Sequence, residues 1–298
     1  MIWGQLAALG TAISFSMGST MFTLAGRRVG SPLVNRMRLL VALPMVMMLH
    51  LIATGELLPL DVASERWFWM GLSGVIGLAL GDAALFQAFV MLGPRLAMLI
   101  FATNPVMGLI MAWIFLGETL TALQLFGIFI TLMGIAWVVS EPNDTRKSLA
   151  PRMYLIGIGF ALLGAFGQAS GMITSKVGLG EDMLPLTGNV MRLFISTLLL
   201  WTFTAIRFQA VPSFQRIRQN RRALLLLTGG AFTGPVIGVW LSLIAVQRAP
   251  VGIVSTLTAL TPVFLIPIGR IVFGESISRR AVMGTAVAFL GSALLFIQ

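Results

Sequence analysis

The chain has 298 residues, of which 57% are apolar and only 10% are charged, and its mean hydropathy is +0.95. A soluble domain carries about 25% charged residues, so this composition excludes a water-soluble protein and indicates one that lies in a lipid bilayer. The net charge is +10, but the basic residues lie between apolar segments, which indicates membrane topology and contact with anionic lipids rather than nucleic-acid binding.

Ten stretches of the sequence are long and apolar enough to span a bilayer, which takes about 20 residues per helix. We expect an all-α membrane protein with helices near residues 2–25, 33–54, 67–91, 95–116, 121–139, 152–175, 185–206, 222–246, 250–273 and 280–297. Long polar connections lie at 55–66, 140–151 and 207–221. The middle connection predicts a first five-helix unit at 1–139, a linker at 140–151 and a second unit at 152–298.

The second segment contains two polar residues of interest. Arg38 lies about one and a half turns inside it, and Arg192 has the matching position in the seventh segment. Such an arginine most often extends to a lipid head group, and a clamp on the carboxylate of a substrate is the alternative. His50 lies near the end of the second segment. It is the only histidine, and the chain has no cysteine, so a zinc site is excluded.

Asp82 in the third segment is the only acidic residue well inside a predicted span. An ionisable group at this depth costs several kcal/mol unless it faces a wet cavity or a partner. It therefore either binds a proton or a substrate amine, or joins helices by bonding to Arg38 or Arg192. The matching position in the second half is Val239, so its role is confined to one half of the chain.

Each half has a proline in the middle of a span, Pro105 in the fourth segment and Pro262 in the ninth. Proline removes a backbone hydrogen bond and tends to kink a helix, and such helices often serve as hinges and substrate contacts in transporters. Phe101 and Asn104 lie one turn earlier on the same face and can line a cavity.

A short Gly-Glu turn follows each of these segments, at Glu118 and at Glu275. Thr119 or Thr121 after the first turn, and Ser276 or Ser278 after the second, can cap the helix that follows. A carboxylate also suits the positive N-terminal end of a helix. Structural capping is therefore favoured over proton coupling at these glutamates.

The two halves repeat each other. The run Asn104-Pro105-Val106, Gly117-Glu118-Thr119, Gly127 and Gly134 recurs 157 positions later as Thr261-Pro262-Val263, Gly274-Glu275-Ser276, Gly284 and Gly291. Gly77 and Gly81 match Gly234 and Gly238 at the same offset. Because five spans is an odd number, the second copy must enter the membrane from the opposite face, so we expect inverted repeats.

The distribution of basic residues agrees with this inversion. The connections after the first, third, fifth, seventh and ninth segments, with their flanks, hold 16 of the 20 lysines and arginines, and the other face holds 4. The positive-inside rule then predicts that both termini are on the non-cytoplasmic side.

Ten spans as five plus five, with Pro105 and Pro262 each followed by a Gly-Glu turn, resemble the EamA family of the drug/metabolite transporter superfamily. The stretch from Gly81-Asp82 to Pro94-Arg95-Leu96-Ala97 is also similar to that of bacterial amino-acid exporters in this family. The resemblance implies two inverted repeats around a central cavity and a location in the bacterial inner membrane.

We therefore expect a secondary transporter that exports small metabolites, in the first place amino acids, by alternating access. The alternatives are a channel or an exporter of drugs or other metabolites; a membrane-embedded enzyme fits less well, because no catalytic group of residues stands out. We expect a monomer that contacts membrane lipids and binds neither a cofactor nor nucleic acid. Coupling of transport to protons stays open. The candidate substrate-binding residues are Asp82, Phe101, Asn104, Gln168 and Trp240, although a buried glutamine or tryptophan more often joins helices.

Overall fold

The computed structural model describes residues 1–92, 97, 100–101, 103–139, 151–273 and 279–294, and over these residues the chain is helical, with no strand. The helices are α1 (Ile2–Val29), α2 (Ser31–Thr54), α3 (Ser64–Ser73), the π-helix η1 (Gly74–Gly81), α4 (Asp82–Leu92), α6 (Asn104–Leu116), α7 (Ala122–Val139), α8 (Pro151–Leu179), α9 (Pro185–Ile206), α10 (Ala210–Arg218), α11 (Arg221–Ala231), the π-helix η3 (Phe232–Gly238), α12 (Val239–Arg248), α13 (Val251–Thr258), α14 (Thr261–Phe273) and α15 (Arg279–Leu294).

Within the described residues, six helical stretches are long and apolar enough to cross a membrane, namely Ile2–Val29, Pro32–Thr54, Ser64–Ala88, Arg152–Leu179, Pro185–Ile206 and Arg221–Arg248. Four shorter apolar helices fall in the other predicted spans, at Asn104–Leu116, Ala122–Trp137, Val251–Leu265 and Val282–Leu294. The all-helical membrane fold is thus confirmed, and the count of ten spans stays a prediction.

Large apolar side chains cover the outside of the helices. Ile52, Trp113, Phe115 and Leu225 are each between 64% and 78% exposed. Water would not tolerate so much exposed apolar surface, whereas hydrocarbon does, and helices satisfy every backbone hydrogen bond internally. The helices are therefore apolar on both their lipid-facing and their buried sides.

Equivalent helices of the two halves run antiparallel. Along α2 and α9, His50 near the end of α2 contacts Thr187 at the start of α9, while Trp201 late in α9 donates to the carbonyl of Arg36 early in α2. In the equivalent fourth and ninth segments, α6 and α13 also run antiparallel, because Gly108 lies beside Ser255 and Glu118, just after α6, accepts from the N–H of Val251, the first residue of α13. This is the relation that an inverted repeat requires.

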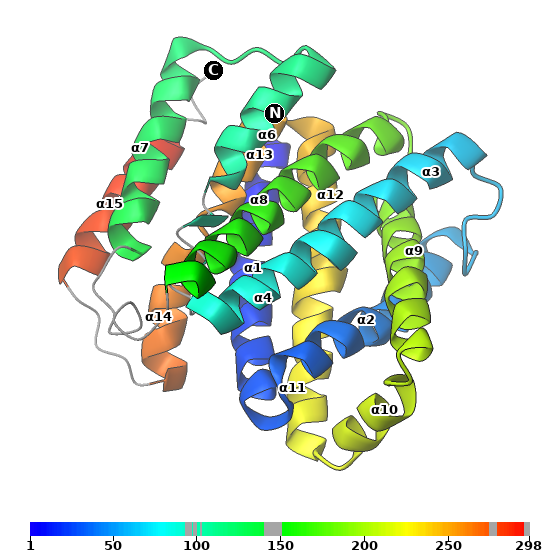
Figure 1. Ribbon diagram of the computed structural model, residues 1–298. Coiled ribbons are helices and arrows are strands. Elements are labelled where there is room, and N and C mark those ends of the chain that lie inside the picture. Colours follow the sequence, from blue (N-terminus) through cyan, green and yellow to red (C-terminus); the bar gives the residue numbers. More distant parts are fainter. Residues whose placement is uncertain (93–96, 98–99, 102, 140–150, 274–278, 295–298) are drawn as a thin grey trace.

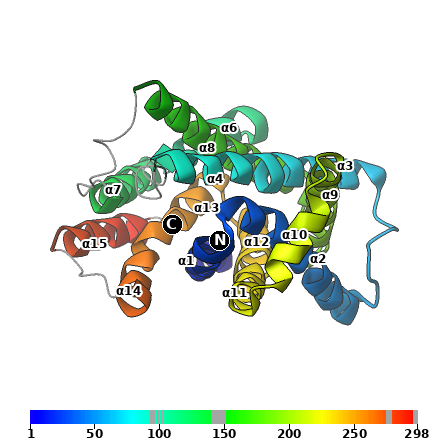
Figure 2. The ribbon, with the colours of Figure 1, turned by 60° about the horizontal axis from the view of Figure 1, so that its bottom comes forward.

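The helices α7 and α15 form another antiparallel pair and lie side by side at one edge of the molecule (Figures 1 and 2). A Cβ at Gly134 would lie 2.4 Å from the backbone N of Ala288, and one at Gly291 would lie 2.4 Å from the backbone N of Thr131. Only glycine fits at either position. The two glycines are 157 residues apart, so the repeat places one on each helix and the backbones meet directly.

The first helix of each half packs against the third-segment helices of the other half. The helix α1 lies against α11, η3 and α12, and α8 lies against α3, η1 and α4. Glycines permit both contacts: Gly18 of α1 lies close to the backbone of Gly234, and Gly167 of α8 lies close to the backbone of Gly81. The halves are therefore interlocked rather than set next to each other.

Two local features differ from the sequence-based expectation. The connection 207–221, predicted as a polar loop, contains the helix α10, which buries Ser213 and Ile217 and leaves Val211 and Phe214 exposed. The third and eighth segments are not regular α-helices, because π-helices occupy their middles at η1 and η3. Pro235 explains η3 in part, since proline lacks the N–H that a regular helical turn requires.

The helix α10 and the start of α11 lie at one end of the molecule (Figure 1), which carries four arginines between 216 and 222. The charge distribution predicts that this end is cytoplasmic. Since the chain lacks cysteine, a single cysteine at exposed Gln219 should stay unlabelled by a membrane-impermeant thiol reagent in intact cells, and one at exposed Glu56 should be labelled. Labelling at Gln219 with none at Glu56 would reverse the orientation.

Candidate functional site

Two cavities lie at opposite ends of the molecule. One, of about 370 Å³, is lined by the start of α2, by α4 and by the end of α9, at the basic end. The other, of about 410 Å³, is lined by Met1, the turn after α6, the end of α8 and the α12–α13 connection. Both volumes lie in the range of small-molecule pockets. Because they open at opposite ends, they can report on access from the two sides of the membrane.

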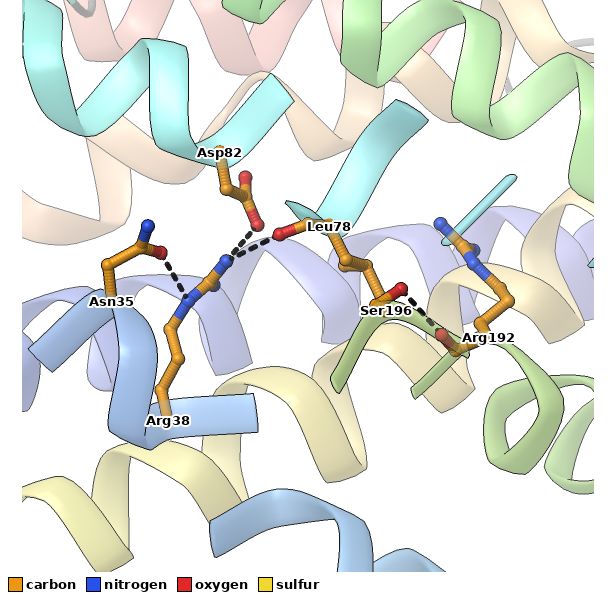
Figure 3. Close-up of polar contacts among 6 residues, drawn as sticks. All are labelled: Asn35, Arg38, Leu78, Asp82, Arg192 and Ser196. Carbon is orange, nitrogen blue, oxygen red and sulfur yellow. Dashed lines mark hydrogen bonds and ion pairs between the residues drawn. The ribbon is translucent and has the colours of Figure 1, made fainter. Parts of the chain in front are cut away.

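Asp82 forms an ion pair with Arg38. The guanidinium of Arg38 also donates to the carbonyl of Leu78 at 3.1 Å and to Oδ1 of Asn35 at 3.1 Å, as Figure 3 shows. It lies over the ring of Phe86, which together with Asn35 lines the cavity at the basic end. The Arg38 side chain is 8% exposed and that of Asp82 is 18% exposed, so the pair is largely desolvated.

The π-helix η1 determines how Asp82 is presented. Asp82 follows η1 directly, at the first position of α4. Glycines on η1 allow close packing on two sides, because a Cβ at Gly74 would lie 2.5 Å from the carbonyl of Arg192, and Gly81 meets Gly167 of α8. π-helical turns are often found at functional sites. The acidic residue thus lies directly after the irregular stretch of its segment.

Arg192 on α9 differs from its counterpart Arg38. It is 5% exposed, and its Nε has no hydrogen-bond partner in the described part of the chain. Its guanidinium lies against Gly77 of η1, where a Cβ would be 3.4 Å from Nη2. In Figure 3 it lies on the far side of Leu78 from Asp82, although it is near enough for the charge of Asp82 to act on it. Neither arginine therefore extends to a lipid head group.

The helices that contain the two prolines are broken rather than kinked. Pro105 lies in the first turn of α6, after a turn at Thr103, and α13 ends at Thr258 before α14 begins at Thr261. A proline at the start of a helix loses no hydrogen bond that the helix needs. Pro262 is the second residue of α14, so both prolines start a new helix at equivalent points.

Unsatisfied polar atoms accompany these breaks. Asn104 is 3% exposed and Thr258 is 7% exposed, and neither Oδ1 of Asn104 nor Oγ1 of Thr258 has a hydrogen-bond partner in the part of the chain that the structure describes. Since α6 and α13 are antiparallel with Gly108 beside Ser255, the two residues lie toward the same end of the contact. Buried polar atoms normally find partners, so these two are available to a ligand or to water.

The other predicted site residues do not gather around one cavity. Phe101, Gln168 and Trp240 are all partly buried, and Trp240 packs against the apolar core. None of them lines either of the two cavities described above. The structure thus brings Asp82 together with Arg38, and leaves these three as candidates supported by sequence alone.

Polar contacts join the two halves at the end opposite to the basic one. Glu118 accepts from Lys176 Nζ at 2.5 Å through Oε1 and from the N–H of Val251 at 2.7 Å through Oε2, and Lys176 also donates to the carbonyl of Ala249 at 3.2 Å. Glu118 therefore caps the start of α13 from the other half, not the helix that follows it. The cap of α7 comes from Thr121, which exchanges hydrogen bonds with Gln124. Glu275 lies outside the described residues.

Two further bridges lie at this end. Arg66, early in α3, donates to both carboxylate oxygens of Asp182, at 2.7 and 2.8 Å. These hydrogen bonds lower the pKa of the Asp182 carboxyl below its usual value, so the bridge stays ionised at neutral pH. His50 is shared between Oγ1 of Thr187, at 3.0 Å, and the carbonyl of Glu56, at 2.7 Å, which is a structural role.

Comparison with known proteins gives a consistent result. The model of the EamA-like transporter family matches the chain twice, at residues 2–140 and at residues 155–297. A solved structure described only as "Crystal structure of protein" shares 16% identity and a TM-score of 0.78, covering 99% of this chain and 96% of that chain. No curated protein matches the chain.

Proposed function

Because the chain belongs to the EamA-like transporter family, within the drug/metabolite transporter superfamily, we propose that it exports small organic metabolites as a secondary carrier. Amino acids are the first candidates, on the strength of the stretch that follows Gly81-Asp82. We further propose ten spanning segments in two inverted halves around a central cavity, in the inner membrane of a bacterium. The carrier acts as a monomer among membrane lipids.

The observation that best supports alternating access is the difference between the two ends. At the basic end a cavity is lined by Asn35 and Phe86, which both contact Arg38 of the Asp82–Arg38 pair. At the other end the Glu118–Lys176 and Arg66–Asp182 bridges tie the halves together, and Glu118 and Lys176 also line the second cavity. In a carrier built from inverted repeats, exchange of conformation between the halves converts one such state into its opposite. We infer that the described state is open toward the basic end.

The proposed substrate site lies between these ends. Asp82 is released from Arg38 to bind a substrate amine or a proton, and Phe101, Asn104, Gln168 and Trp240 complete the lining. The breaks before Pro105 and Pro262 act as hinges. In support, the broken helices leave Asn104 Oδ1 unsatisfied, and irregular helices in membranes are tolerated mainly where they line a cavity or bury against protein.

Transport by purified protein in proteoliposomes tests the proposal. With a panel of amino acids on one side, a carrier gives saturable uptake, and counterflow drives a labelled amino acid against its gradient. Flux that never saturates and never exceeds the gradient would indicate a channel. Uptake that rises with an imposed pH gradient would add protons as the coupling ion. Saturable counterflow of drugs alone would replace amino acids as the substrate class.

A further inference from the structure

One face of α9 carries two buried polar side chains that each have one atom without a hydrogen-bond partner among the described residues. These atoms are Nε of Arg192, which is 5% exposed, and Oδ1 of Asn189, which lies one turn earlier and is fully buried. The orientation of the Asn189 amide is fixed, because its Nδ2 donates to the carbonyls of Pro235 and Val236, each at 3.2 Å. A donor and an acceptor therefore stay unsatisfied within a single turn of one helix.

The first half shows what satisfies this pair of residue types. Asn35 and Arg38 have the same spacing on α2, and there Arg38 Nε donates to Asn35 Oδ1 at 3.1 Å. The charge of Arg38 is neutralised by Asp82. In the second half, the position equivalent to Asp82 is Val239. The second half therefore has the equivalent arginine but no acidic residue at the equivalent position.

An arginine in this position is costly without an anion. Buried guanidinium groups are normally paired, and leaving one unpaired is strongly destabilising. Asp82 does not neutralise Arg192, because it forms its ion pair with Arg38. Arg38, Asp82 and Arg192 together therefore carry one net positive charge. Lipid phosphate has no access, since Arg192 is packed under η1 beside Gly77. A small anion that enters through the protein would complete the site.

We propose that Arg192 binds the carboxylate of the transported substrate and that Asn189 Oδ1 accepts from its amino group. This inference rests on the proposed carrier function and names the substrate class as carboxylates that also bear a hydrogen-bond donor, which describes an amino acid. A guanidinium offers parallel N–H donors that match a carboxylate. The substrate carboxylate then supplies the negative charge that Val239 does not.

Thermal unfolding of the purified protein tests the site without any transport. The probes are common amino acids, each beside its carboxamide, with sodium chloride and sodium phosphate at equal ionic strength. We expect at least one amino acid to raise the unfolding temperature, and its carboxamide to have at least tenfold lower apparent affinity. Stabilisation by phosphate alone, or by the carboxamide as well as by the acid, would overturn the proposal. So would no stabilisation by any amino acid.

Variants at Arg192 distinguish a binding role from a structural one. Arg192→Met removes an unpaired buried charge, so the ligand-free protein should unfold at least about 2 °C higher and lose the response to amino acids. Arg192→Lys keeps the charge but not the parallel donors, and should weaken the response at least tenfold. Arg222→Gln, at an exposed arginine at the start of α11, is the control and should behave as wild type. An Arg192→Met protein that is destabilised, or that still responds, contradicts the proposal.

Failure of this inference is separable from failure of the proposed function. If amino acids stabilise the wild-type protein in an Arg192-dependent way but are not transported, the proposed site stands and the proposed carrier function is wrong. Conversely, Arg192→Met protein with counterflow at an unchanged KM refutes the site and retains the carrier.

Discussion

Replacing Asp82 with asparagine is expected to lower export at least tenfold while the amount of protein in the membrane stays normal. Asparagine keeps the shape and can still accept a hydrogen bond from Arg38, and Arg38 retains its bonds to Asn35 and Leu78. The variant nevertheless loses the negative charge that a proton or a substrate amine requires. A tenfold loss corresponds to about 1.4 kcal/mol in the transport barrier. Uptake in proteoliposomes at matched protein content measures it.

A double-mutant comparison decides whether the ion pair itself is what matters. Arg38→Gln and the combined Asp82→Asn/Arg38→Gln variant complete the cycle. If Asp82 takes part in transport, the double variant stays as impaired as Asp82→Asn. If the carboxylate serves only to neutralise Arg38, removing both charges together should restore export. Wild-type export by Asp82→Asn alone would also assign the residue a structural role.

A covalent link at the end opposite to the basic one is expected to abolish transport completely. Arg66 and Asp182 contact each other across the two halves, and both are accessible. In the natural cysteine-free background, cysteines at these two positions can be joined through two disulfide bonds by a short bis-methanethiosulfonate crosslinker. Since the linked protein cannot open this end, it should be trapped in one of the two access states. Transport should return when the link is cleaved by a reducing agent.

The inverted repeat predicts a companion result at the basic end. Cysteines at Gln87 and Gln209, which line the cavity there from different segments, should arrest transport when they are linked. Each single-cysteine variant, treated in the same way, is the control and should transport normally. Undiminished flux through protein shown to be fully linked at Arg66 and Asp182 would exclude the alternating-access proposal.

Most of the helical arrangement could be predicted because spanning segments are set by length and apolarity. The predicted segment 185–206 coincides with Pro185–Ile206, and 33–54 nearly coincides with Ser31–Thr54. The antiparallel relation of the halves followed from counting spans and from the 157-residue offset. The helix α10 was missed because nine residues with a polar average resemble a loop.

The candidate site was predictable only in part, because it depends on contacts between distant segments. Asp82 stood out as a buried acid, and Arg38 was one of two possible partners. Nothing in the sequence indicated which arginine would be paired, or that Glu118 would cap a helix of the other half. The π-helices were also missed; they contain Gly77 and Gly81 in the first half and, at the repeat offset, Gly234 and Gly238 in the second.

Because the first helix of each half packs against the other half, the order of synthesis affects how this protein folds. During synthesis α1 is made long before α11 and α12, against which it packs. Likewise, α7 is made long before its packing partner α15. Neither half can complete its own interior, because Gly18 and Gly134 make their closest contacts beyond the linker. We therefore expect that the first of the two repeats matched by the family model finishes its packing only after α11, α12 and α15 are inserted.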